Sequence, residues 1–136
     1  MIIDVSDIAA LKEFSIKLAN NLPSKCIITL EGNLGVGKTA FSQFFLKALG
    51  VKSHVISPSY MIVNEYYTDQ YIVHADFYRL NCEDNLDLLG WDIMLEKADI
   101  IVVEWPKSLV KADIQIKMVL GEKRTLELIT DYKLNL

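Results

Sequence analysis

The chain has 136 residues, a formal net charge of −4 and a pI near 5.1. A chain of this length buries about 68% of the surface of its unfolded form, enough for one hydrophobic core, so we expect a single domain over residues 1–136. The acidic charge argues against tight unaided binding to nucleic acid, and without a long apolar run or a basic leader we expect a cytoplasmic protein with no membrane partner.

The first half of the chain alternates helix and strand patterns. Apolar side chains recur with a helical period between residues 8 and 22, with Ser6 as the expected N-cap. Residues 26–30 are an apolar, β-branched run typical of a buried strand. Residues 41–49 again follow the helical period, so the order helix, strand, helix is predicted.

Two runs of strand character come next, at residues 60–67 and 71–77, and their three-residue spacing predicts an antiparallel hairpin. The two-residue period of the second run places His74 and Asp76 on one face of its strand. Residues 82–97 then follow a helical pattern. The residues expected to face inward from that helix are Leu86, Leu89 and Ile93.

The last part of the chain predicts a buried strand and a second hairpin. Residues 100–103 are a continuous apolar run that ends in Glu104, the pattern of a buried strand with an acid at its carboxyl end. A short helical turn through Val110 is expected after it. Residues 114–120 and 126–129 flank a glycine-containing turn and predict the hairpin.

The stretch from Gly32 to Thr39 reads GNLGVGKT and fits G-x-x-x-x-G-K-[ST] at every fixed position, between a strand pattern and a helix pattern. In such a loop, backbone N–H groups and the helix dipole point at phosphate oxygens. Lys38 would reach the β- and γ-phosphates, and Thr39 would bind the Mg²⁺ that bridges them. The residues expected to bind the nucleotide are Asn33, Leu34, Gly35, Val36, Gly37, Lys38, Thr39 and Ala40.

These patterns together predict an α/β fold. We expect one P-loop NTPase-like domain with a mixed, mostly parallel central sheet, antiparallel hairpins, and helices on both faces of the sheet.

Two acids at strand ends are candidates to complete a magnesium site, because Thr39 and the nucleotide fill only part of an octahedral shell. Glu104 has the position of a Walker-B acid, the alternative being a solvated carboxylate at a strand end. Asp76 also lies at a strand end, the alternative being a surface ion pair with Arg79. We predict that both acids face the nucleotide.

Further residues have two readings each. His74 is either a buried core histidine or a base, and Arg79 either contacts a phosphate or holds Asp76. Trp105 either packs in the core or shields the site from water. The tyrosines of the first hairpin are expected to pack across it, with nucleobase stacking as the alternative. They are Tyr60, Tyr66, Tyr67 and Tyr71.

Four strings, in this order and spacing, resemble the TsaE (YjeE) family of small P-loop ATPases. They are GNLGVGKT, SPSY at residues 57–60, HADFYRL at residues 74–80 and VEWP at residues 103–106, and Arg124 also fits. Ser59 and Phe77 stand where the family usually has threonine and leucine, and residues 90–93 depart from the family pattern.

The resemblance implies an ATPase of bacterial tRNA modification that uses ATP and Mg²⁺. It would act with the TsaD and TsaB proteins, which install threonylcarbamoyl on adenosine next to the anticodon, and would meet tRNA only indirectly through that complex. Its hydrolysis would reset the partners and be slow without them. By position, Asp76 and Glu104 would serve the metal and the attacking water, and Ser59 would occupy a switch-like position.

Other classes remain open from the residues themselves. A small-molecule kinase uses the same loop, but such enzymes commonly clamp the phosphate with several arginines, and this chain has only Arg79 and Arg124. A GTPase is disfavoured because no N-K-x-D string occurs. A nucleotide-binding interaction module without catalysis would behave like such an ATPase until the partners were added.

Overall fold

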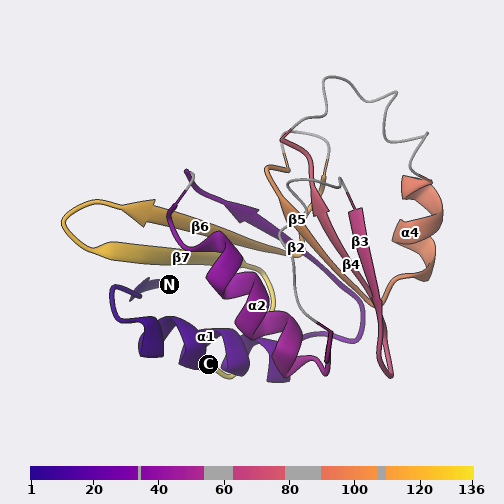
Figure 1. Ribbon diagram of the computed structural model, residues 1–136, viewed down its shortest axis with the longest axis horizontal. Coiled ribbons are helices and arrows are strands. Elements are labelled where there is room, and N and C mark those ends of the chain that lie inside the picture. Colours follow the sequence, from indigo (N-terminus) through magenta and orange to yellow (C-terminus); the bar gives the residue numbers. More distant parts are fainter. Residues whose placement is uncertain (34, 54–62, 79–89, 107–109) are drawn as a thin grey trace.

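A seven-stranded sheet forms the centre of the part of the chain that the computed structural model describes, which is residues 1–33, 35–53, 63–78, 90–106 and 110–136 (Figure 1). The spatial order of the strands is β1-β7-β6-β2-β5-β4-β3. The strands are β1 (Ile2–Asp4), β2 (Cys26–Glu31), β3 (Val63–Tyr67), β4 (Tyr71–Asp76), β5 (Ile100–Glu104), β6 (Ile114–Leu120) and β7 (Arg124–Thr130). The helices within these ranges are α1 (Ile8–Asn20), α2 (Lys38–Ala48) and α4 (Trp91–Lys97).

The sheet is mixed, as the sequence predicts. The four central strands run parallel, through the pairs β4–β5, β5–β2 and β2–β6. The outer pairs β3–β4, β6–β7 and β1–β7 are antiparallel, so the six pairings divide evenly between the two kinds. Parallel pairing is confined to the centre because the two expected hairpins supply the strands on either side of it.

Helices cover both faces of the sheet. Alternate residues of the fully buried strand β5 point to opposite faces: Ile100 and Val102 join a core beneath α1 and α2, and Ile101 and Val103 join a core beneath α4. Figure 1 shows α1 and α2 lying together, with α4 at the opposite end of the sheet near β3 and β4. The predicted two-sided cover is confirmed.

Two details at the start of the chain differ from the predictions. The N-cap of α1 is Asp7, whose side chain accepts a hydrogen bond from the Ala9 N–H at 3.0 Å. Ser6 binds the distant backbone of Arg124 instead, accepting its N–H at 2.9 Å. The sequence also gave no sign of β1, because three residues are too few to show a two-residue period.

The inward face of α4 also differs from the prediction. Ile93 is 59% exposed, so its predicted inward orientation is wrong. Trp91 is buried in its place, with its ring 5.0 Å from the ring of Phe77 in an edge-on arrangement. Leu86, Leu89, Tyr60 and the turn predicted after residue 106 lie outside the described residues. No helix among those described is long and apolar enough to cross a membrane.

Candidate nucleotide site

The glycine-rich loop joins the carboxyl end of β2 to the start of α2, where the sequence predicts it. Gly37 is the N-cap of α2 and has a φ of 114°, in the left-handed region that favours glycine. At Gly32 a Cβ would lie 2.8 Å from the Met118 carbonyl oxygen, so only glycine lets the loop pass this close to β6. The first N–H groups of α2 therefore point out of the helix at the loop, as anion binding requires.

Lys38 is the first residue of α2, and its side chain is buried. Its Nζ has no hydrogen-bond partner among the described residues. It lies over the indole of Trp105, 4.0 Å from the ring centroid. Burial lowers the pKa of Lys38, and the charges of Glu104 and Asp76 work against that shift. A buried ammonium without an acceptor is costly unless an anion joins it.

The two candidate acids lie side by side. Asp76 ends β4 and Glu104 ends β5, and they are register partners in the parallel pair. Both are buried, at 8% and 4% exposure, so Glu104 is not a solvated carboxylate. Burial, and next the charge of Glu104, raise the pKa of Asp76, while the Tyr78 N–H at 2.9 Å and the ammonium of Lys38 oppose the rise. Two carboxylates and one cation thus share the edge where ligands bind in such sheets.

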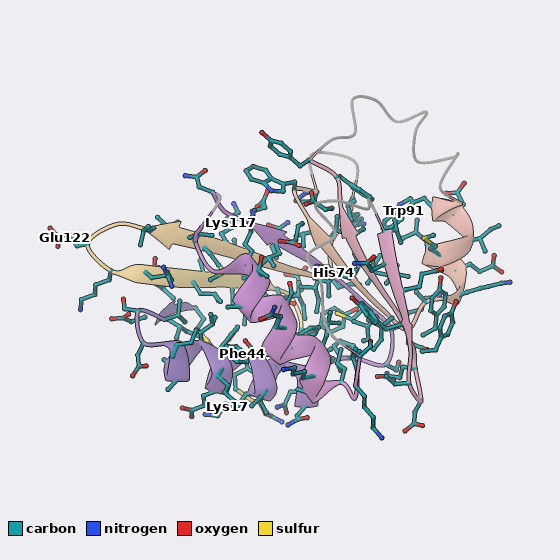
Figure 2. All side chains as sticks on the ribbon, in the orientation of Figure 1. Lys17, Phe44, His74, Trp91, Lys117 and Glu122 are labelled. Carbon is teal, nitrogen blue, oxygen red and sulfur yellow. The ribbon has the colours of Figure 1, made fainter. Side chains whose placement is uncertain are left out.

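His74 belongs to β4, the strand next to the edge strand β3, and contacts one of these acids (Figure 2). Its Nε2 is 2.9 Å from Oε2 of Glu104, with both side chains buried. Its Nδ1 has no partner among the described residues. The contact fixes one oxygen of Glu104. Sequence analysis placed His74 on the same face as Asp76 but did not predict its contact with Glu104. That contact runs diagonally between β4 and β5, and the pattern of a single strand does not reveal the register of two strands.

Trp105 covers the lysine. It directly follows β5 and has a φ of 51°, a strained value for a residue with a side chain. Its ring lies 4.0 Å from Lys38 Nζ and 5.1 Å from the ring centroid of Tyr78. Whether Trp105 serves core packing or shields the site from water stays a prediction.

The other predicted residues are placed as follows. Asn33, Gly35 and Thr39 are exposed, Gly37 and Ala40 are partly buried, and Val36 is buried. Leu34, Ser59 and Arg79 lie outside the described residues, so the proposed pair of Asp76 with Arg79 does too. Within the described ranges, no group of three or more His, Cys, Asp and Glu side chains could hold a metal ion.

Two of the described tyrosines of the first hairpin pack on one another, whereas Tyr66 packs against the core beneath α1 and α2. Tyr67 stacks on Tyr71 with the ring centroids 5.0 Å apart, and Tyr71 also bonds Glu65 through its hydroxyl. Tyr71 begins β4, whereas Asp76 ends it. This pair therefore lies at the end of the strand away from the phosphate loop, where it packs across the hairpin as expected.

Comparison with known proteins identifies the family of the chain. The family described as "Threonylcarbamoyl adenosine biosynthesis protein TsaE" matches residues 5–128. The chain belongs to the TsaE family. Its predicted membership is thereby confirmed, and the family takes part in the biosynthesis of tRNA threonylcarbamoyladenosine.

Individual relatives support the same assignment. A TsaE protein of Synechocystis is 36% identical over 108 residues, covering 76% of this chain and 68% of the relative. One of Borreliella burgdorferi is 32% identical over 136 residues, covering 94% and 98%. The crystal structure of Bacillus subtilis YdiB superposes with a TM-score of 0.74 at 24% identity, covering 93% of this chain and 82% of that one, which shows a common fold.

Proposed function

We propose that this protein is a Mg²⁺-dependent ATPase, one domain over its 136 residues, that acts with TsaD and TsaB in the threonylcarbamoyl modification of tRNA adenosine. Its hydrolysis of ATP resets the partner complex, and tRNA is met only through that complex. One observation carries the ATPase proposal. The buried ammonium of Lys38 lies at the start of α2, without a hydrogen-bond partner among the described residues and within electrostatic reach of two buried carboxylates.

The residues present fit a magnesium ion. Mg²⁺ prefers oxygen ligands and keeps several waters, so the hydroxyl of Thr39 and the carboxylates of Asp76 and Glu104, direct or through water, suit it. Asp76 and Glu104 are buried at the ends of neighbouring strands, and the pKa of Asp76 is raised. This is expected of a cation site when no cation is bound to neutralise its carboxylates. When bound, the ion neutralises charge on the β- and γ-phosphates.

The protein groups have separate tasks in the proposed hydrolysis. Lys38 and the first N–H groups of α2 bind phosphate oxygens and stabilise charge on the departing ADP. Water attacks the γ-phosphorus, the bond to the bridging oxygen breaks, and the products are ADP and phosphate. Glu104, held by His74, orients the water, so His74 is a positioning residue. Trp105 excludes other water from the lysine.

Steady-state ATPase assays with and without purified TsaD and TsaB test this proposal. We expect slow turnover alone and a clear rise with both partners, because a site with few arginines gains from a cation supplied in trans. Lys38→Ala should abolish both rates, and Lys123→Ala, at an exposed lysine, should change neither. No turnover in any mixture would contradict the ATPase proposal. Transfer of phosphate to a small alcohol would favour the kinase instead.

A further inference from the structure

The two helices that cover one face of the sheet have a groove between them on their outer side. Figure 1 shows α1 and α2 lying together, and the groove between them has a volume of about 380 Å³. Its lining comes from successive turns of α1 and from the last turns of α2, at spacings that put each set on one side of its helix. The lining residues are Lys12, Ile16 and Asn20 of α1 and Phe44, Lys47 and Ala48 of α2.

The floor of this groove is apolar. Ile16 is 37% exposed, and Phe44 and Ala48 are only partly buried against the core. Figure 2 shows Phe44 on the side of α2 that faces α1. An apolar side chain laid on this floor would remove its surface from water, which is favourable in proportion to the area covered.

The two lysines of the groove have no acid beside them. Within the described residues, neither Lys12 nor Lys47 forms an ion pair. Lys17, which lies on α1 outside the groove, is by contrast 3.1 Å from Glu13. The Nζ of Lys12 lies 6.0 Å from the ring centroid of Phe44, above the apolar floor. In a chain with a net charge of −4, the groove therefore combines an apolar floor with local positive charge.

The groove is separate from the nucleotide site, although α2 contributes to both. Lys38 is the first residue of α2, and the groove lies toward the carboxyl end of the same helix. At the rise of an α-helix, Phe44 lies roughly 9 Å and Ala48 roughly 15 Å along the helix from Lys38. A ligand in the groove would thus leave the phosphate loop open to a nucleotide.

We propose that this groove binds an acidic segment of a partner protein, with a large apolar side chain on Phe44 and Ile16 and carboxylates on Lys12 and Lys47. Charge complementarity and the apolar floor together define the occupant, because peptides in grooves are held by apolar anchors and selected by the charges around them. A nucleic acid would meet only two cations on an acidic protein. An anionic membrane surface is typically bound by about four to eight clustered basic residues.

Selection of short random peptides displayed on phage, with the full chain as the target, tests this proposal. We expect the selected peptides to share an apolar residue flanked by Asp or Glu. One of them, synthesised with a fluorescent label, should bind about 3- to 30-fold more weakly when Lys12→Gln and Lys47→Gln are combined, the loss of two partly exposed ion pairs. Ile16→Ser should weaken its binding by about fivefold or more, because apolar contact is lost.

A matched double variant controls for net charge. Lys17→Gln combined with Lys123→Gln removes two charges at exposed lysines outside the groove and should leave the peptide affinity within about twofold. Calorimetry with ADP should give the same affinity for both double variants, because the groove and the phosphate loop lie at opposite ends of α2. If Ile16→Ser does not fold, the lysine variants decide the test, since both groove lysines are exposed.

Three results would overturn the proposal. The first is a selection that yields no peptide whose binding depends on Lys12 and Lys47. The second is a peptide pool that is basic, or that binds both double variants equally well. The third is sedimentation of the full chain, but not of the groove double variant, with vesicles of phosphatidylglycerol and phosphatidylcholine, which would assign the groove to a membrane surface.

Discussion

Substitution of Glu104 by glutamine and by alanine should separate the catalytic role of this carboxylate from its structural role. The side chain is 4% exposed, and its Oε2 lies 2.9 Å from His74 Nε2. Glutamine keeps an oxygen that can accept from His74 but removes the charge. Alanine removes both and leaves the imidazole without a partner at either nitrogen among the described residues.

The structure sets the size of each effect. Glu104→Ala should lower the free energy of unfolding by about 1 to 3 kcal/mol, the cost of an unsatisfied buried polar group. For a chain of 136 residues this corresponds to a melting temperature lower by roughly 3 to 10 °C. Glu104→Gln should stay within about 1 kcal/mol. Both should slow hydrolysis by about 100-fold or more, because neither can orient water as a carboxylate does.

Three measurements on each variant test the reasoning: thermal unfolding, ADP affinity by calorimetry, and partner-stimulated ATP turnover. Nucleotide affinity should change by less than about tenfold in Glu104→Gln, because the carboxylate reaches the nucleotide through metal and water. Glu127→Gln and Glu127→Ala, on the exposed face of β7, serve as controls. If Glu104→Gln turned over ATP at the normal rate, Glu104 would not be part of the chemistry.

Three further outcomes are expected. Lys38→Ala should weaken ADP binding by about 100-fold or more in calorimetry, and unchanged affinity would remove the basis of the site. Nucleotide binding should change the fluorescence of Trp105, recorded in a Trp91→Phe background, because a phosphate on Lys38 disturbs the indole contact; a constant spectrum at saturation would contradict this. Asp76→Asn should stabilise the nucleotide-free protein at pH 7, because burial raises the pKa of Asp76 in the folded state. The stability that the protonated Asp76 contributes is fully present below pH 3.8, the pKa in the unfolded chain, and is lost as the pH rises through the raised pKa of the folded state. That gain should shrink as urea unfolding is repeated toward pH 4, and a gain independent of pH would count against the burial argument.

The fold could be predicted largely from local patterns. The apolar run that ends in Glu104 is typical of a buried strand, and the glycine-rich stretch from Gly32 to Thr39 is typical of a phosphate-binding loop. Strand β1 was missed because three residues are too few to show a two-residue period. The N-cap of α1 was misassigned because a distant contact decides what Ser6 binds. Ser6 would be an adequate cap, but its hydroxyl pairs with the backbone of Arg124 on β7.

The site was predictable in its parts and not in its contacts. Sequence analysis put Asp76 and Glu104 each at the end of a strand, and the structure makes them register partners at one edge of the sheet. The bond from His74 to Glu104 and the position of Trp105 over Lys38 depend on side-chain directions at a sheet edge, which no one-dimensional pattern encodes. The inward orientation of Ile93 was wrongly predicted for a similar reason. Which side of the seven-residue helix α4 is buried depends on the elements that it packs against.

The contact between Lys38 and Trp105 has a consequence for how tightly any anion can bind. The Nζ of Lys38 has no accessible surface to offer, so an incoming phosphate oxygen reaches it only after the ring or the lysine has moved. The measured dissociation constant is then the intrinsic constant divided by the fraction of molecules in which the ammonium is uncovered. Anything that shifts that fraction, including a protein seated against Trp105, would tune affinity without touching the nucleotide.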